Sequence, residues 1–285
     1  MIYKKDYYCL VAGLPDLLFN DNKPGFDSLE FYTELKHQLN RTDYELVKLL
    51  FLQSDNKNLL NLIFEQDKPF NLQGNYTKSF LEKQISQPIE IPDYITHFLR
   101  FVKNRETHEL NLQTENKLHS LYFGYALTTT NTFLREWFEF ELNTKNILTA
   151  FNCKQFNYSL ETHLIPAGKN NTVYQLLTHK HLKHEYFEDE LPFAEQIFRI
   201  AESDATPEEK EKNIDKIRWD YLEEQTFFHY FTIEKILSYI IKLGIMERWM
   251  KLDAETGKAL LNKLIEELKH SYTFPEEFSV VKGPT

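Results

Sequence analysis

Apolar residues recur every three or four positions along most of this chain, which is the spacing of an amphipathic helix. Residues 27–39 show the pattern clearly, with Leu29, Tyr32, Leu35 and Leu39 on one face. Polar capping residues and prolines mark the starts of similar segments. On these signals we expect helices at 27–39, 42–52, 55–63, 77–86, 92–102, 172–180, 192–202 and 254–270.

Several of these helices begin at a residue that favours a helix start. Thr42-Asp-Tyr-Glu45 fits a capping box, in which the threonine and glutamate side chains each satisfy a free backbone N–H group. Either Asp55 or Asn56 is expected to cap the next helix, Thr77 the following one and Asp253 the last.

Two longer helices are expected. The helical pattern continues for about forty residues from Glu115, with Thr128-Thr-Thr-Asn131 in its middle. Such side chains compete for backbone hydrogen bonds, so we expect a kink or an interruption there. Thr206-Pro-Glu-Glu209 is a strong helix start, because it combines a cap, a proline at the first position and acids at the positive helix end. That helix is expected to run to Leu243 and stop at Gly244.

Strand-like patterns are confined to residues 7–14 and 278–281. The expected fold is therefore mainly α, a multi-helix bundle built from long helices. The polar residues 104–114 form a connection between an N-terminal helical region, 1–110, and a C-terminal region of long helices, 111–285. One continuous domain is the alternative.

Aromatic residues gather in two regions. Phe133, Trp137 and Phe140 form a stripe at helical spacing within 133–155, and four of the five residues in 227–231 are aromatic. We interpret both groups as core packing, and the alternative is a partner-facing groove with tryptophan and tyrosine anchors. A shift of 89 residues brings apolar positions of the first region onto the second. This pattern is either a helical repeat or the chance register of two amphipathic helices.

Composition excludes several classes of protein. Only 8 of 285 residues are glycine, which suits long helices better than a Rossmann domain or a β-sandwich. The formal net charge of −10 argues against a nucleic-acid binder and against a polybasic membrane-surface protein. Cys9 and Cys153 give no disulfide framework. No signal peptide and no transmembrane run is found, so we expect a cytoplasmic protein without direct lipid insertion.

Motifs for chemistry are few, and each has a simpler structural interpretation. Neither G-x-G-x-x-G nor G-x-x-x-x-G-K-[ST] occurs. His179-Lys-His-Leu-Lys-His184 is the densest group of metal-ligating residues, but its lysines repel a cation, so a solvated turn is preferred. Both cysteines lie among apolar residues, where thiols are usually inert. Acidic pairs such as Glu139 with Glu141 are interpreted as solvated helix faces. We expect no catalytic residue, cofactor or metal.

Two segments resemble a known family. Tyr7-Tyr8 followed by Gly-Leu-Pro-Asp16, together with Thr232–Lys242 leading to Glu247-Arg-Trp249, resembles a bacterial family of unknown function encoded in V-type ATP synthase operons. A more distant similarity is to the C subunit of V-type ATPases, called the d subunit in eukaryotes. Asn146–Lys154, with Glu141 upstream, resembles the acid, Asn-Leu and Arg-containing pattern of that protein, although Asn152 stands where its arginine is expected.

The resemblance implies a helical protein like that C subunit, without an active site of its own. Its partners would be other V-type ATPase subunits, in the central stalk and the membrane ring, and it would lie at the inner membrane through that complex. The alternatives are an assembly or regulatory factor of the same complex and an enzyme that uses buried carboxylates. The residues expected to contact partners are Trp137, Glu141, Asn146, Trp219 and Trp249.

Overall fold

The computed structural model describes residues 5–19, 28–104, 109–166, 171–179 and 184–271, with side chains of the last range up to residue 252. Within these ranges the chain forms helices and no strand, so the expectation of a mainly α fold is confirmed. The first six helices are α1 (Tyr8–Ala12), α2 (Ser28–Gln38), α3 (Arg41–Ile63), α4 (Lys78–Ser86), α5 (Asp93–Lys103) and α6 (Leu112–Ala126). The others are α7 (Thr132–Phe156), α8 (Leu160–His163), α9 (Thr172–His179), α10 (Ala194–Glu202), α11 (Pro207–Gln225) and α12 (Ile233–Ser271), with a 3₁₀ turn at His184–Tyr186.

The helices pack around one continuous hydrophobic core that includes residues from Tyr7 to Leu243. α7 lies near its centre and contacts α6, α8, α9 and α10, while α3 contacts α2, α4, α6 and α12. Helix α5 packs on α6 across the expected boundary at 110–111. The two-region division stays a prediction, but the buried cluster joins both regions.

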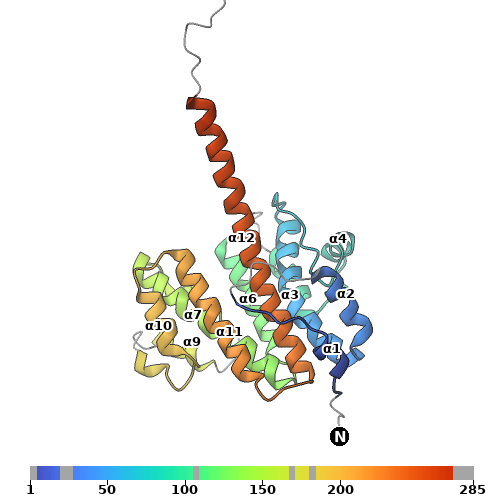
Figure 1. The fold of residues 1–285 in the computed structure, drawn as a ribbon. Helices are drawn as coiled ribbons and strands as arrows, with labels where there is room; N and C mark the ends of the chain where they lie inside the picture. Colours follow the sequence, from blue (N-terminus) through green and yellow to red (C-terminus); the bar gives the residue numbers. More distant parts are fainter. Residues whose placement is uncertain (1–4, 20–27, 105–108, 167–170, 180–183, 272–285) are drawn as a thin grey trace, which may run out of the picture.

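Helix α12 is the longest helix and gives the molecule its outline. It packs on α3 and α11 over its first part and then runs beyond the body of the protein (Figure 1). With 39 residues, it is about 58 Å long at 1.5 Å per residue. Up to residue 252, where the description of side chains ends, the last buried apolar residue of α12 is Met246.

Capping residues explain where several helices begin. Thr77 accepts a hydrogen bond from the backbone N–H of Phe80, and Thr206 forms a full capping box with Glu209, as expected. The expected interruption after Thr128 is also present, because Asn131 caps α7 by accepting from Leu134 N. Asn40, and not Thr42, caps α3, since its side-chain oxygen accepts from Asp43 N at 2.9 Å.

The two helices expected at 42–52 and 55–63 are one helix, α3. Asp55 and Asn56 are buried in its middle and do not cap a helix start. The carboxylate of Asp55 accepts hydrogen bonds from the backbone N–H groups of Asn75 and Tyr76, at 3.0 and 3.2 Å. Residues that favour a helix start are tolerated in the middle of α3 because partners distant in sequence satisfy their oxygens, and for Asn56 that partner is the hydroxyl of Tyr94 at 2.8 Å.

The helix expected from 206 to 243 is broken at residues 226–232, and Gly244 lies inside α12. Thr226 donates its hydroxyl to the carbonyl of Leu222 at 2.7 Å at the end of α11. The carbonyl of Phe231 in the following loop accepts from Tyr7 N at 2.7 Å. A hydrogen bond between residues distant in sequence therefore holds the loop between α11 and α12 in place. The local spacing of apolar residues does not reveal this loop. Asp253 is likewise internal to α12 and caps no helix.

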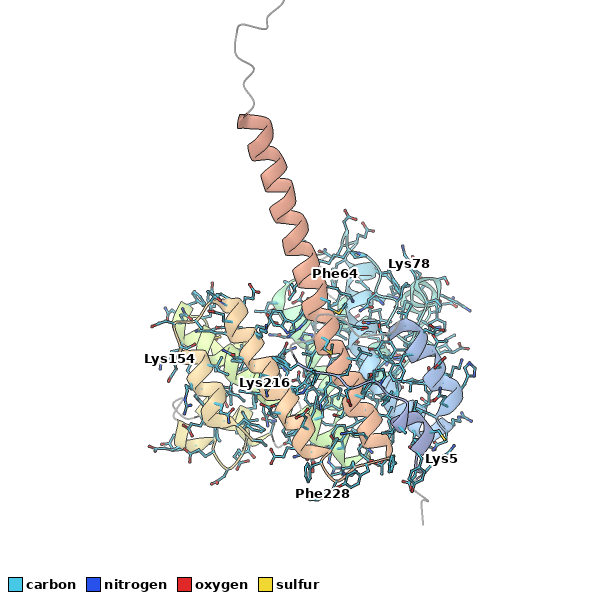
Figure 2. The ribbon with its side chains drawn as sticks, viewed as in Figure 1. Lys5, Phe64, Lys78, Lys154, Lys216 and Phe228 are labelled. Atoms are coloured by element: carbon cyan, nitrogen blue, oxygen red, sulfur yellow. The ribbon has the colours of Figure 1, made fainter. Side chains whose placement is uncertain are left out.

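The aromatic residues of 227–231 lie in this loop, and most of them are exposed. Their exposure contradicts the expectation that they pack in the core. Phe227, Phe228 and Tyr230 have 65%, 79% and 63% of their surface exposed. Figure 2 shows Phe228 extending outward at the end of the body opposite the far end of α12. The shift of 89 residues aligns Phe138, which is buried in the core, with Phe227, which lies in an exposed loop. This difference argues against a structural repeat.

Residues 7–14, whose pattern fits either a short strand or a buried helical turn, contain helix α1, and none of the residues of α1 is buried. The other strand candidate, at 278–281, lies outside the described residues. Cys9 is exposed and Cys153 is buried, and both are free thiols. Cys9 is exposed at a surface pocket that Leu10, Leu14 and Phe31 also line.

Candidate functional site

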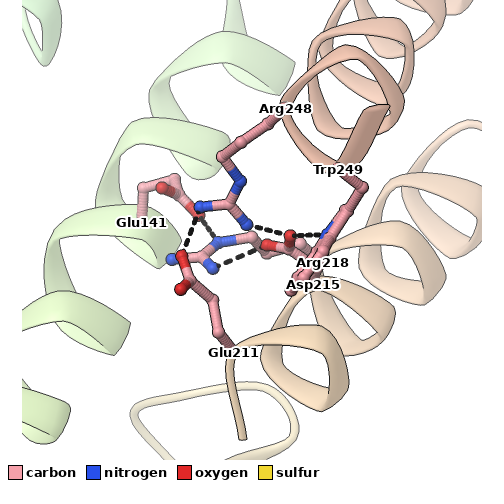
Figure 3. A network of polar contacts seen from close by, with 6 residues as sticks. All are labelled: Glu141, Glu211, Asp215, Arg218, Arg248 and Trp249. Carbon is pink, nitrogen blue, oxygen red and sulfur yellow. Dashed lines mark hydrogen bonds and ion pairs between the residues drawn. The ribbon is translucent and has the colours of Figure 1, made fainter. Parts of the chain in front are cut away.

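A network of charged side chains joins α7, α11 and α12 around Asp215 (Figure 3). The carboxylate of Asp215 is almost fully buried and accepts from Arg218 Nη1 at 2.9 Å and from the indole Nε1 of Trp249 at 2.7 Å. It also accepts from Arg248 of α12. One aspartate on α11 therefore holds two consecutive residues of α12.

The network extends outward through both arginines. Arg218 Nε donates to Glu141 of α7 at 2.5 Å, and Arg248 Nη1 donates to Glu211 of α11 at 2.7 Å. Burial alone would lower the pKa of Arg218, but the carboxylates of Glu141 and Asp215 raise it above its ordinary value. A buried ion pair of this kind is strongly destabilising when one partner is removed, because the other charge stays buried without compensation.

A second contact between α11 and α12 lies at Trp219. Its indole Nε1 donates to Glu223 at 2.9 Å, and Lys242 of α12 donates to the same carboxylate at 3.1 Å. The ammonium group of Lys242 also lies 4.9 Å from the centre of the Trp219 ring, a cation–π distance. The first part of α12 is thus fixed to α11 at two places along its length.

The other two residues expected to contact partners lie elsewhere on α7. Trp137 is buried, with its ring centre 6.2 Å from that of Tyr221. Asn146 is fully buried, donating to the carbonyl of Ile165 at 3.0 Å and accepting from its N–H at 2.8 Å. Glu141, Trp219 and Trp249 therefore lie at the junction of α7, α11 and α12, while Trp137 and Asn146 do not. Partner contact by these five residues stays a prediction.

Asp215, Arg218 and Arg248 were not recognised from the sequence. Helix α11 is strongly polar, so its charged residues look like a solvated face. The spacing of Asp215 and Arg218 allows an ion pair on one helix face, but it does not show that another helix covers that face. Burial of a charge depends on the tertiary packing of α12.

A pocket of about 490 Å³ opens between α6, α7 and residues 156–165. Its polar lining includes Glu115, His119 and Lys145. Burial, together with the smaller effect of the charges of Lys145 and Lys57, lowers the pKa of His119 to about 4. Burial also lowers the pKa of Lys145, against the opposing effect of Glu141. The histidine is therefore neutral near pH 7.

Burial raises the pKa of the Cys153 thiol, which also lines this pocket. A thiol of raised pKa carries less thiolate at neutral pH and is a poorer nucleophile. Lysine, neutral histidine and amide groups around an apolar wall suit the binding of a ligand better than nucleophilic attack on one.

Across the part of the chain that the structure describes, no three His, Cys, Asp or Glu residues are placed to hold a metal ion. His181, the central residue of the histidine cluster at 179–184, lies outside that part. Among the same described residues, none of the helices combines the length and apolar character needed to cross a membrane.

Over the described residues, the fold and contacts define a helical protein whose longest helix is fixed to the body by partly exposed ion pairs and then extends beyond it (Figure 1). The chain belongs to the family described as "Protein of unknown function (DUF2764)", whose model matches residues 4–272. No curated protein and no solved structure matches it.

Proposed function

We propose that this protein is a non-catalytic, all-helical subunit of a V-type ATPase, acting as the adaptor between the central stalk and the membrane ring in proton or sodium transport. The resemblance of Glu141 and Asn146–Lys154 to the pattern of the V-type C subunit supports this proposal. The structural observation that carries it is the fixation of α12 at Asp215 and Trp219, followed by its extension beyond the body (Figure 1).

An adaptor in a rotary machine must transmit torque without bending. The interior of a helical protein is close-packed, so a load applied to one helix is passed to its neighbours. The contacts of Arg248, Trp249 and Lys242 with α11 support this role, because they connect the first part of α12 to the body through charged and hydrogen-bonded groups. In this proposal the far part of α12 contacts another subunit, and the body contacts a second one.

The carboxylates that converge in the structure support a mechanical role over acid–base catalysis. Glu141, Glu211 and Asp215 each accept a hydrogen bond from a guanidinium group. A general acid or base needs access to a substrate and a pKa near neutrality. Carboxylates held by arginines are better suited to joining helices than to moving protons.

Affinity purification of the tagged full chain from its own cells tests the proposal. We expect the catalytic, stalk and ring subunits of a V-type ATPase to co-purify. An assembly or regulatory factor would instead be recovered with incomplete complexes and be absent from the mature enzyme. Recovery of the protein without any ATPase subunit would contradict both functions.

A substitution distinguishes a role in coupling ATP hydrolysis to ion pumping from mere attachment of the protein to the complex. Asp215→Asn removes the charge that holds Arg218 and Arg248, while Asp220→Asn changes an exposed residue of the same helix paired with Lys216. In the purified complex we expect Asp215→Asn to lower ion pumping more than ATP hydrolysis. Asp220→Asn should leave both rates unchanged.

A further inference from the structure

The pocket between α6 and α7 contains a lysine that makes no direct ion pair with a described residue, although the charges of Glu141 and Glu115 act on it from a greater distance. Lys145 lies on α7 in the pocket lining and is half-buried. Among the described residues it makes no ion pair and no hydrogen bond. A half-buried ammonium group in a pocket of ligand size is an attractive partner for an anion.

The neighbouring groups limit the charge of that anion. Glu115 also lines the pocket and acts on Lys145 electrostatically, although the two make no ion pair. A second negative charge on the ligand would be repelled by Glu115. His119 is neutral near pH 7, because burial lowers its pKa to about 4, so it contributes a hydrogen-bonding group and no charge. A single negative charge therefore fits this lining best.

The remaining walls are apolar and fixed in place. Leu112, Phe156 and Ile165 lie in the lining, which suits an aliphatic or aromatic ligand body. The wall formed by residues 160–165 is held on both sides. Asn146 makes two hydrogen bonds to the backbone of Ile165, and Asn116 donates to the carbonyl of His163 at 2.9 Å. A wall fixed before binding reduces the entropy lost when a ligand enters.

From these features we infer that the pocket binds a small monocarboxylic acid, with its carboxylate at Lys145 and its apolar body against Leu112, Phe156 and Ile165. This inference goes beyond the proposed ATPase role and does not rest on it. A ligand of this class would link the state of the helical protein to the concentration of an organic acid.

Titration of the full-length protein with 3-phenylpropionate, followed by ligand-observed NMR and calorimetry at pH 7.5, tests the inference. We expect saturable binding of the carboxylate. The neutral 3-phenylpropionamide and the dianionic phenyl phosphate should bind at least about tenfold more weakly, since a charged hydrogen bond is lost or a repulsion is gained. Equal binding of acid and amide, or no saturable binding of the acid, would overturn the inference.

Two variants locate the site. Lys145→Met keeps the length of the side chain and removes its charge, and we expect about tenfold weaker binding of 3-phenylpropionate. Lys154→Met is the matched control, because Lys154 is exposed on the same helix and does not line the pocket. Affinity unchanged in Lys145→Met would overturn the assignment.

Glu115→Gln provides a second test that does not depend on Lys145. Without the glutamate charge, phenyl phosphate should gain affinity relative to 3-phenylpropionate. An unchanged preference would show that Glu115 does not select the ligand charge, and would overturn that part of the inference.

Discussion

Asp215 is a buried charged residue through which side chains of three helices are connected. It is 1% exposed and receives hydrogen bonds from Arg218, Arg248 and Trp249. These donors come from two helices, and Arg218 connects Asp215 to Glu141 on a third. Asp215 therefore provides one of the two polar attachments of α12 to the body, and the other lies at Glu223.

Asp215→Asn should lower the free energy of unfolding by about 3–5 kcal/mol, because it leaves the Arg218 charge partly uncompensated in a buried site. Urea unfolding followed by circular dichroism measures this change. Asp220→Asn on the same helix removes an exposed pair with Lys216 and a minor electrostatic effect on Lys242, so it should cost less than about 1 kcal/mol. Similar losses for both variants would show that the Asp215 network is not a stabilising centre.

His119 should make stability depend on pH. Its pKa is lowered by burial to about 4 in the folded protein, whereas a histidine in the unfolded chain titrates near 6.5. The unfolded state thus binds the proton more tightly, and the contribution of His119 to stability is present above about pH 6.5 and lost as pH falls towards 4. The slope is at most about 1.4 kcal/mol per pH unit.

His119→Gln should remove this slope, and the difference from the unmodified protein is measured by urea unfolding at several pH values between 4 and 7. The exposed His97 on α5 gives a control, since His97→Gln should leave the profile as it was. Parallel profiles for the unmodified protein and His119→Gln would contradict the burial of this imidazole.

At the scale of the elements, helix type was predictable and helix continuity was not. The spacing of apolar residues and the caps at Thr77, Asn131 and Thr206 are local signals, and the helices expected from them are present. The positions where one expected helix is broken, or where two expected helices are continuous, depend on contacts between residues distant in sequence. Asp55 stays inside α3 because the loop at residues 75 and 76 donates to it.

The same distinction holds for the candidate site. Glu141, Trp219 and Trp249 could be selected from the sequence, because tryptophan is rare in this chain and Glu141 precedes the segment that resembles the V-type C subunit. Arg218 and Lys145 could not, since lysine and arginine on a helix are usually solvated. Their burial follows from which helices pack together, and a single sequence does not contain that information.

The loop between α11 and α12 gives a direct test of this distinction. Phe228 is 79% exposed and Phe138 is fully buried. Phe138→Ala should cost about 3–5 kcal/mol of unfolding free energy, while Phe228→Ala should change it by less than about 0.5 kcal/mol. Thermal and urea unfolding of the two variants checks this. A large loss from Phe228→Ala would place that ring in the core.

At the scale of the whole molecule, the proposed function gives the compact core and the projecting part of α12 separate roles. The described core residues of α12 end at Met246, whereas the helix continues to Ser271. We expect a chain ending after Leu252 to keep its helical core and to unfold within about 1 kcal/mol of the full chain, because surface changes away from the core alter stability little. The same shortened chain should lose its association with the ATPase, measured by affinity purification beside the full-length protein.

A loss of folding in the shortened chain would mean that the far part of α12 stabilises the body. Retained association would mean that the body alone makes the partner contacts. Either result would contradict the division between a packed core and a projecting docking helix.

The most direct measurement of the central claim is the number of copies of this protein in the purified V-type ATPase from cells that express it. Quantitative mass spectrometry against labelled peptides of the central-stalk subunits gives that number. An adaptor that turns with the stalk should be present at one copy per stalk. Absence from the active enzyme, or recovery far below one copy, would contradict the account.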